Sequence, residues 1–341
     1  MSGPLIVGID GAELSAETRE MLMHPTIGGI ILFTRNYADP DQLRSLTREL
    51  RQLRKPRLLL MVDQEGGRVQ RLRNAFTALP PLSLLGRWYQ SHPQRALDMA
   101  YRHARVMAAE VLAVGVDMSL APVIDLNRGS SVIGDRAFSS EPEEIIELAG
   151  HYLAGMHDAG MKTCGKHYPG HGSVEADSHF EIVQDERSLL AIEQDLQPFI
   201  ALHGKLDSIM PAHVCYQSAD DRPAGFSHFW IQQKLREQIG YRGVVISDDL
   251  DMAGATIAGT MLDRWQSCHA AGCDLALVCR PESVAPLLDE LDALHQPLPD
   301  TSASIRKLYG RAAFAFKEQL TVPEFRAWRD SLNRLSEAHS D

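Results

Sequence analysis

Cysteine is scarce in this sequence, and long apolar segments are missing altogether. The five cysteines among 341 residues show no paired metal-ligand spacing, and their odd number does not suit a disulfide framework. No apolar run approaches the roughly 18 residues that a membrane-spanning helix needs, so no membrane anchor is expected. The N-terminus has no basic segment leading an apolar core, so a signal peptide is not expected either. Together these absences predict a protein of a reducing, cytoplasmic compartment.

Positive charge is also in short supply. The sequence has 34 lysines and arginines against 45 aspartates and glutamates, a formal net charge of −11. This balance argues against nucleic acid or an anionic membrane as the main partner, although local basic patches could bind an acidic ligand. No Gly-x-Gly-x-x-Gly motif follows the first predicted strand, and no Walker loop or serine nucleophile elbow is present. We therefore expect a small-molecule substrate and no cofactor.

Eight short apolar segments alternate with helical patterns. This alternation predicts parallel βα units, and five of the segments end in polar or charged clusters, as expected where βα loops build a site at one face of a barrel. We predict a TIM (β/α)8 barrel rather than a doubly wound open sheet, in one catalytic domain over residues 1–341. The barrel is expected over about 1–295 and extra C-terminal helices over about 300–338. The predicted strands are 5–10, 28–33, 57–62, 117–123, 161–165, 208–214, 243–249 and 274–278.

Capping and periodicity signals predict two helices clearly. Asp39 followed by Pro40 is a capping carboxylate before proline at the first helical position, and leucines then recur at spacings of three and four. A second helical pattern covers roughly 93–113.

The stretch from Lys166 to Gly172 is the most unusual in the chain, because it combines histidines with proline and glycine. It reads as a strand end that opens into a polar, ligand-facing loop. His167 and His171 are four residues apart, but the intervening Pro169-Gly170 rules out the helix that would put both on one face. A metal site is therefore not expected, and for His171 we favour a hydrogen bond to the backbone of its own loop.

Two further groups of residues could carry proton transfer or nucleophilic attack. Asp177 lies two residues before His179, and such a carboxylate can accept the Nδ1 proton of the histidine and leave Nε2 to a substrate. Farther along, Asp248 and Asp249 end an apolar strand. Strand alternation points Asp248 away from the side of Ser247 and Asp249. One of the two acids can face the barrel mouth while the other anchors the loop, and spacing does not choose between them.

Charged residues also stand on or just beyond other strand ends. Arginine forks and carboxylates around a pocket suit ligands rich in hydroxyl groups or bearing a carboxylate. Arg68 and Asp135 are interpreted as an ordinary ion pair between loops. The candidates for ligand contact are Asp63, Arg71, Arg136 and Lys166.

These motifs resemble glycoside hydrolase family 3. The resemblance is carried by Lys166-His167-Tyr168-Pro169-Gly170-His171-Gly172, by Asp177-Ser178-His179 and by Gly243-Val244-Val245-Ile246-Ser247-Asp248-Asp249. Two further stretches, Val62–Arg71 and Ile133–Phe138, are similar to the family's single-domain β-N-acetylglucosaminidases of cell-wall recycling. Tyr168 departs from the phenylalanine that is frequent there, a change of little consequence.

The resemblance implies a retaining, two-step hydrolysis of N-acetylglucosamine–1,6-anhydro-N-acetylmuramoyl peptides, without metal or cofactor. In this family Asp248 matches the nucleophile, His179 matches the acid/base, and Asp177 matches the residue that orients the histidine. The residues matched to sugar binding are Asp63, Arg71, Arg136, Lys166 and His167.

Three alternatives stay open. A phosphorylase would transfer the sugar to phosphate instead of water, and a family β-glucosidase would prefer the plain sugar. Family glucosidases usually add a second domain, for which this chain has no room. A sugar-binding regulator without turnover is the third alternative, disfavoured because Asp248, Asp177 and His179 are all present.

Overall fold

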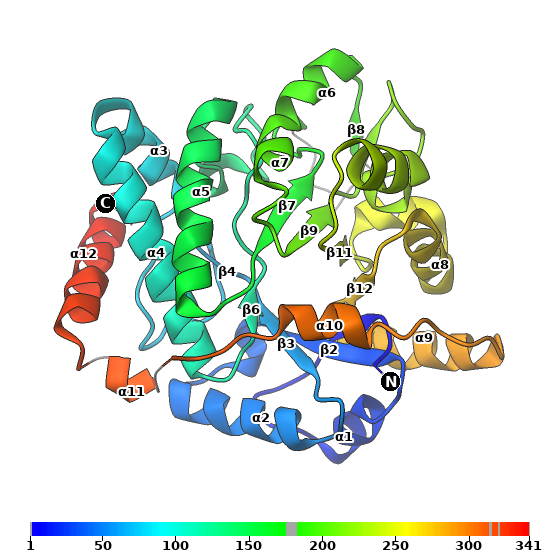
Figure 1. Ribbon diagram of the computed structural model, residues 1–341. Coiled ribbons are helices and arrows are strands. Elements are labelled where there is room, and N and C mark those ends of the chain that lie inside the picture. Colours follow the sequence, from blue (N-terminus) through cyan, green and yellow to red (C-terminus); the bar gives the residue numbers. More distant parts are fainter. Residues whose placement is uncertain (1, 175–182, 314–315, 320, 341) are drawn as a thin grey trace.

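Eight parallel strands form one sheet in the computed structural model (Figure 1), which describes residues 2–174, 183–313, 316–319 and 321–340. Neighbours in the sheet follow the order β6-β3-β2-β1-β12-β11-β9-β7. All eight predicted strands are present, and every pairing between them is parallel. The strands are β1 (Leu5–Gly8), β2 (Ile27–Leu32), β3 (Leu59–Val62), β6 (Met118–Ser119), β7 (Cys164–Tyr168), β9 (Ser208–Pro211), β11 (Val244–Asp249) and β12 (Leu275–Val278).

The two edges of this sheet, β6 and β7, meet and close it into a ring. The backbone N–H of Cys164 donates to the carbonyl of Ala121 at 2.8 Å, and that of Ile124 donates to the carbonyl of Lys166 at 2.9 Å. Val123 also pairs with Lys166 in a parallel bridge. An open doubly wound sheet would leave both edges unpaired. The predicted (β/α)8 barrel is therefore confirmed.

The bounds of several strands differ from the prediction, and the difference at β7 affects the placement of site residues. The segment predicted at 161–165 is β7, which begins at Cys164 and continues to Tyr168. The prediction ended this strand too early because charged Lys166 and the following Pro169-Gly170 suggested a loop. In the fold, Lys166 pairs with Met210 of β9, so its backbone is part of the ladder. Lys166 and His167 consequently project from a strand.

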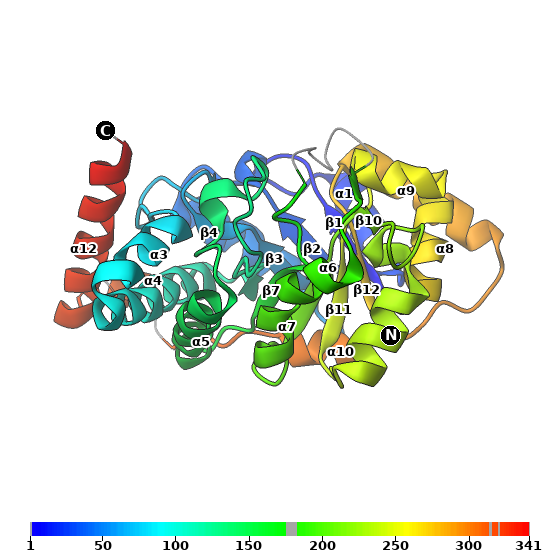
Figure 2. The ribbon, with the colours of Figure 1, turned by 90° about the horizontal axis from the view of Figure 1, so that it is seen from above.

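Helices cover the outside of the ring (Figures 1 and 2). The helix predicted from Asp39-Pro40 is α2, where the Asp39 carboxylate accepts from the N–H groups of Asp41 and Gln42 at 2.9 Å each. The pattern at 93–113 is α4. The α-helices up to the last strand are α1 (Ala16–Leu22), α2 (Pro40–Gln52), α3 (Leu82–Ser91), α4 (Pro93–Ala113), α5 (Pro142–Ala159), α6 (Leu189–Asp195), α7 (Gln197–Leu202) and α8 (Met261–Ala271).

Shorter elements occupy the connections between strands and helices. They are hairpin β4 (Gln64–Gly66) and β5 (Val69–Gln70), strand pair β8 (Val183–Asp185) and β10 (Val214–Tyr216), 3-10 turns η1 (Thr34–Asn36), η2 (Gly134–Arg136), η3 (Ala224–Phe226) and η5 (Ala253–Ala258), and π-helix η4 (Phe229–Gln238).

The C-terminal part is helical, and it packs against the ring. It contains α9 (Pro281–Ala293), α10 (Ser302–Leu308), α11 (Phe316–Gln319) and α12 (Pro323–Ser340), and Figures 1 and 2 show α12 beside α4. Buried Asp117 pairs with Arg51 at 2.8 Å and Arg57 at 2.7 Å, and accepts from the backbone N–H of Gly310 at 3.3 Å. This cluster ties the C-terminal segment to the amino-terminal side of β6.

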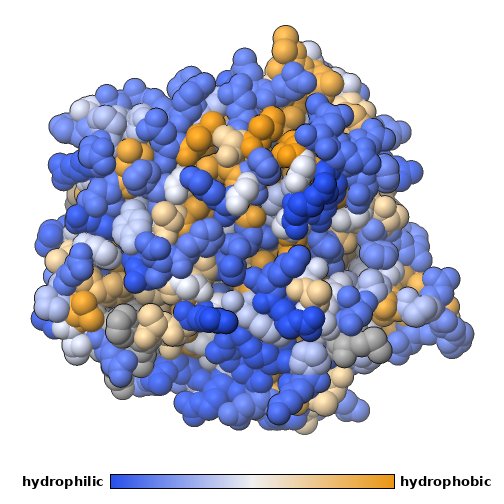
Figure 3. Space-filling model, viewed as in Figure 1, coloured by the Kyte–Doolittle hydropathy of each residue, from blue (hydrophilic) through white to orange (hydrophobic). Residues whose placement is uncertain are grey.

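The visible surface in Figure 3 is largely hydrophilic. Apolar patches on that face lie near α6 and α7, where Leu190 and Ile200 are exposed. Among the helices of the described ranges, none combines the length and apolar character needed to cross a membrane. All five cysteines are buried free thiols.

Candidate active site

A cavity of about 370 Å³ opens at the carboxyl-terminal ends of the barrel strands. Active sites of (β/α)8 barrels lie at this face. Seven of the eight strands contribute to the walls, because residues on or just after β2, β3, β6, β7, β9, β11 and β12 line the cavity. Its apolar wall includes Phe33, Leu120, Met210 and Met252.

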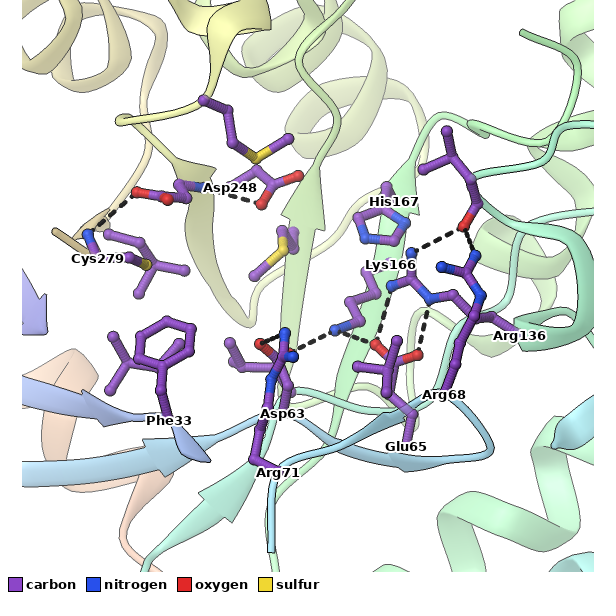
Figure 4. A pocket seen from close by; sticks show the side chains of 18 residues that line it. Phe33, Asp63, Glu65, Arg68, Arg71, Arg136, Lys166, His167, Asp248 and Cys279 are labelled. Atoms are coloured by element: carbon purple, nitrogen blue, oxygen red, sulfur yellow. Dashed lines mark hydrogen bonds and ion pairs between the residues drawn. The ribbon is translucent and has the colours of Figure 1, made fainter. Parts of the chain in front are cut away.

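Six of the eight residues predicted for the site line this cavity. Figure 4 shows them around one hollow, with Asp248 across from Lys166 and His167. Asp177 and His179, predicted as the acid/base pair, lie outside the described residues. The six are Asp63, Arg71, Arg136, Lys166, His167 and Asp248.

The two acids at the end of β11 have different surroundings. The Asp249 carboxylate accepts from the backbone N–H groups of Asp251 at 3.0 Å and Cys279 at 3.1 Å. Burial, with the charge of Asp251 adding to it, raises the pKa of Asp249 to about 7. Asp248 accepts from the N–H of Asp249 at 2.8 Å and lies on the cavity wall. Both acids line the cavity, but Asp249 in addition ties its loop to the backbone just after β12.

The β4–β5 hairpin brings acidic and basic residues to the cavity from a single turn. Gly66 has φ of +111°, and a Cβ there would lie 2.7 Å from the carbonyl oxygen of Pro80, so only glycine fits. The backbone N–H of Arg71 donates to the carbonyl of Asp63 at 3.3 Å and closes the base of the hairpin. The turn thus holds Asp63, Glu65 and Arg71 on one side of the pocket.

Glu65 is the centre of an ion-pair network in the cavity wall. Its carboxylate binds the Arg136 guanidinium twice, at 2.8 Å to Nε and 2.9 Å to Nη2. The same carboxylate contacts Lys166 Nζ at 2.6 Å, and Asp63 contacts that nitrogen at 2.9 Å. Arg71 Nη2 stands 3.8 Å from the other Asp63 oxygen. Two cations predicted to bind sugar are therefore already held by a carboxylate.

The charges of this network are stable at neutral pH. Burial alone raises the pKa of Glu65, but Arg136 and Lys166 outweigh burial and hold that pKa well below its ordinary value. Burial also opposes the charge of Lys166, yet Asp63 and Glu65 raise its pKa above the lysine norm. The pKa of Arg136 is likewise raised, against burial, chiefly by Glu65. Glu65, Lys166 and Arg136 therefore stay ionised.

Asp125 positions His167 and the segment that follows it. Fully buried, it accepts from His167 Nδ1 at 2.8 Å, from the His167 N–H at 3.0 Å and from the His171 N–H at 2.8 Å. Burial opposes its charge, but the contacts with His167 hold the Asp125 pKa below its ordinary value. An ionised carboxylate only accepts, so Nδ1 of His167 carries a hydrogen, and in a neutral imidazole this leaves Nε2 as an acceptor toward the cavity.

The sequence interpretation missed Glu65 and Asp125 as site residues. Glu65 could have been found, since it follows Asp63 by two positions and strand alternation puts both on one side. Asp125 offered no such signal, because its contact with His167 joins two strand ends 42 positions apart. Arg68 and Asp135 form the ordinary pair that was expected, at 3.2 Å and largely exposed.

Among the residues that the structure describes, no group of three or more His, Cys, Asp or Glu side chains is arranged to hold a metal ion. His167 is engaged with Asp125, and burial, followed by the charge of His167, lowers the pKa of His171 to about 4. The backbone N–H of His171 donates to Asp125, and the expected hydrogen bond of its side chain to the loop backbone stays a prediction. The arrangement of paired charges and an apolar wall suits a ligand rich in hydroxyl groups.

Comparison with known proteins agrees with this geometry. The family model described as "Glycosyl hydrolase family 3 N terminal domain" matches residues 5–309. A β-hexosaminidase of Tolumonas auensis is 51% identical over 306 residues, which cover 89% of this chain and 90% of that protein.

Solved structures give the same answer. The crystal structure of native NagZ from Neisseria gonorrhoeae superposes with a TM-score of 0.90 at 38% identity, over 98% of each chain. NagZ from the same organism in complex with N-trifluoroacetyl-D-glucosamine also superposes at 0.90, with 39% identity and 98% of each chain covered. The chain therefore belongs to glycoside hydrolase family 3, among its NagZ-type β-hexosaminidases.

Proposed function

We propose that this protein is a retaining exo-β-N-acetylglucosaminidase that removes terminal N-acetylglucosamine from N-acetylglucosamine–1,6-anhydro-N-acetylmuramoyl peptides during cell-wall recycling. One observation carries the proposal. Asp248 lies on the wall of the same cavity as the Asp63–Glu65–Arg136–Lys166 network, so a carboxylate and a polar sugar-binding wall face one space. The names of the related proteins support the N-acetylhexosamine part of the substrate.

The mechanism has two displacements at the anomeric carbon. In the first, an oxygen of Asp248 forms a bond to that carbon while the bond to the leaving oxygen breaks, and His179 gives that oxygen a proton. In the second, His179 takes a proton from water, the water oxygen bonds to the anomeric carbon, and Asp248 is released. Asp177 orients the histidine. A histidine becomes neutral when it donates its proton, so it adds no second negative charge near Asp248.

The sugar contacts are assigned to Asp63, Arg71, Arg136, Lys166 and His167. Charge-assisted hydrogen bonds from arginine and lysine and to carboxylates are the stronger polar contacts available to hydroxyl and acetamido groups. With Nδ1 held by Asp125, His167 Nε2 can accept from a sugar hydroxyl. The apolar wall contributed by Phe33, Met210 and Met252 can cover the less polar face of the sugar ring.

We also infer that residues 1–341 form one catalytic domain acting in the cytoplasm. The C-terminal segment supports the first inference, because buried Asp117 bonds to the backbone of Gly310 and to arginines of the barrel. The five buried, unpaired thiols support the second, since reducing compartments keep cysteines in this state.

Paired aryl β-glycosides with and without the 2-acetamido group test this proposal. We expect the N-acetylglucosaminide to be the better substrate by a large factor in kcat/KM, with the free sugar released in its β-form. A preference for the plain glucoside would reassign the protein to a glucosidase branch. Repeating the assay with inorganic phosphate distinguishes hydrolysis from phosphorolysis, because a phosphorylase would form the sugar phosphate.

A further inference from the structure

Glu65 stands in the cavity wall but is withdrawn from solvent. The residue is only 2% exposed, and its two carboxylate oxygens form ion pairs with Arg136 and Lys166. A buried carboxylate with both oxygens engaged has little capacity left to bind a ligand. Its role must therefore be sought in the groups that it holds.

We propose that Glu65 is a positioning residue that aims Arg136 and Lys166 at the bound sugar and keeps the cavity close to electrically neutral in front of Asp248. This inference rests on the proposed function, because it takes both cations to contact the sugar.

The aiming follows from the geometry of the contacts. Arg136 presents Nε and Nη2 to the two oxygens of Glu65 at 2.8 and 2.9 Å, a fork that fixes the plane of the guanidinium. Lys166 Nζ lies 2.6 Å from the oxygen that Arg136 Nη2 also contacts. One carboxylate oxygen thus holds two cations next to each other, which would otherwise repel and separate.

The charge balance follows from a count over the cavity walls. Four basic side chains (Arg68, Arg71, Arg136, Lys166) and four carboxyl side chains (Asp63, Glu65, Asp248, Asp249) line the cavity, so the numbers of basic and acidic groups are equal. The sugar becomes positively charged in the oxocarbenium-like transition state of glycoside hydrolysis. Loss of Glu65 alone removes one negative charge from the walls, which disfavours that transition state and draws Asp248 toward its ionised form.

Two substitutions separate aiming from charge. Glu65→Gln keeps the length of the side chain but loses its charge, whereas Glu65→Asp keeps the charge and withdraws it by one methylene. With an aryl β-N-acetylglucosaminide we expect both variants to raise KM by at least about tenfold, because each disturbs charge-assisted bonds to Arg136 and Lys166. Glu65→Gln alone is expected to lower kcat as well, and to move the acidic limb of the kcat/KM–pH profile to lower pH.

A shift in the acidic limb of the kcat/KM–pH profile reports a change in the electrostatic surroundings of Asp248. The described titratable groups that interact electrostatically with Asp248 include His171 after β7, His213 after β9, Cys164 on β7 and Asp249 on β11. None of them is altered in either variant. A difference in the acidic limb between Glu65→Gln and Glu65→Asp therefore reports the missing charge, which a purely structural role would not produce.

Asp135→Asn is the matched control. It removes a carboxylate from another arginine of the cavity, Arg68, in a pair of 3.2 Å whose side chains are 49% and 40% exposed. We expect KM and the pH profile of this variant to match the unmodified protein, and thermal unfolding checks the folding of all three variants.

Two results would overturn the role of Glu65 while leaving the proposed function intact: an unchanged KM in Glu65→Asp, or one acidic limb shared by both Glu65 variants. If Glu65→Gln does not fold, the KM of Glu65→Asp decides alone. Failure of the unmodified protein to cleave the N-acetylglucosaminide would instead refute the proposed function.

Discussion

The contact between Asp125 and His167 determines which ring nitrogen of His167 carries the hydrogen, and this can be tested by substitution. In Asp125→Asn, the amide oxygen can still accept from the N–H groups of His167 and His171, which bond to Oδ1 at 3.0 and 2.8 Å. The amide nitrogen then faces His167 Nδ1, which lies 2.8 Å from Oδ2 in the unmodified protein. An amide nitrogen only donates, so Nδ1 has to accept and the ring hydrogen moves to Nε2.

The expected loss in kcat/KM follows from this exchange of donor and acceptor at the two ring nitrogens. His167 Nε2 changes from an acceptor to a donor, so a sugar hydroxyl that donated to it loses its bond and meets a second hydrogen. Leaving a buried polar group unmatched costs about 1–3 kcal/mol, which corresponds to a loss of roughly 5–150-fold in kcat/KM. The shape of the site changes little because the substitution is isosteric.

The assay is kcat/KM on an aryl β-N-acetylglucosaminide for Asp125→Asn, His167→Ala and the double variant. Because Asp125 acts through the histidine, we expect Asp125→Asn to lower kcat/KM in the natural background and to change it little once His167 is alanine. Thermal unfolding of each variant serves as the control for folding. Equal losses in both backgrounds would refute the reasoning, as would wild-type kcat/KM in the single Asp125→Asn variant.

Three more predictions concern the nucleophile, the acid/base and acid stability. Asp248→Asn is expected to lower hydrolysis by several orders of magnitude while calorimetry still detects sugar binding; near-normal turnover would reassign the nucleophile. His179→Ala is expected to slow substrates with poor leaving groups far more than activated aryl glycosides, and equal losses on both would argue against an acid/base role. Burial lowers the pKa of His103 from 6.5 to about 4, so as the pH falls through this window the unfolded chain binds a proton that the folded one does not. The unfolding free energy should therefore decline by up to about 3 kcal/mol as the pH falls through this range. Urea titrations at pH values above and below the range measure this decline, and it should be smaller in His103→Gln. The same dependence of unfolding free energy on pH in both proteins would contradict this assignment.

Much of the fold was predictable because it depends on local patterns. Apolar segments of strand length separated by helical patterns specify parallel βα units, and a capping residue such as Asp39 marks a helix start without tertiary help. The convergence of Asp63, Lys166 and Asp248 on one cavity follows from the same logic, because the carboxyl ends of all barrel strands meet at one face.

What could not be predicted depends on partners distant in the sequence. The extension of β7 to Tyr168 requires the pairing with β9, and the distinction between Asp248 and Asp249 requires the backbone of Cys279. The role of Glu65 appears only when Arg136 and Lys166 are brought to its two oxygens. Each of these contacts joins segments at least 30 positions apart, where neither periodicity nor capping gives a signal.

The most direct test of the account is to trap the covalent intermediate. A fluorinated N-acetylglucosaminyl donor with a good leaving group should form a glycosyl-enzyme that breaks down slowly. After proteolysis, mass spectrometry is expected to find the added sugar on Asp248, and the label should disappear when excess unlabelled substrate analogue occupies the cavity. A label on Asp63, Glu65 or any other carboxylate, or rapid turnover with inversion and no labelled peptide, would contradict the account.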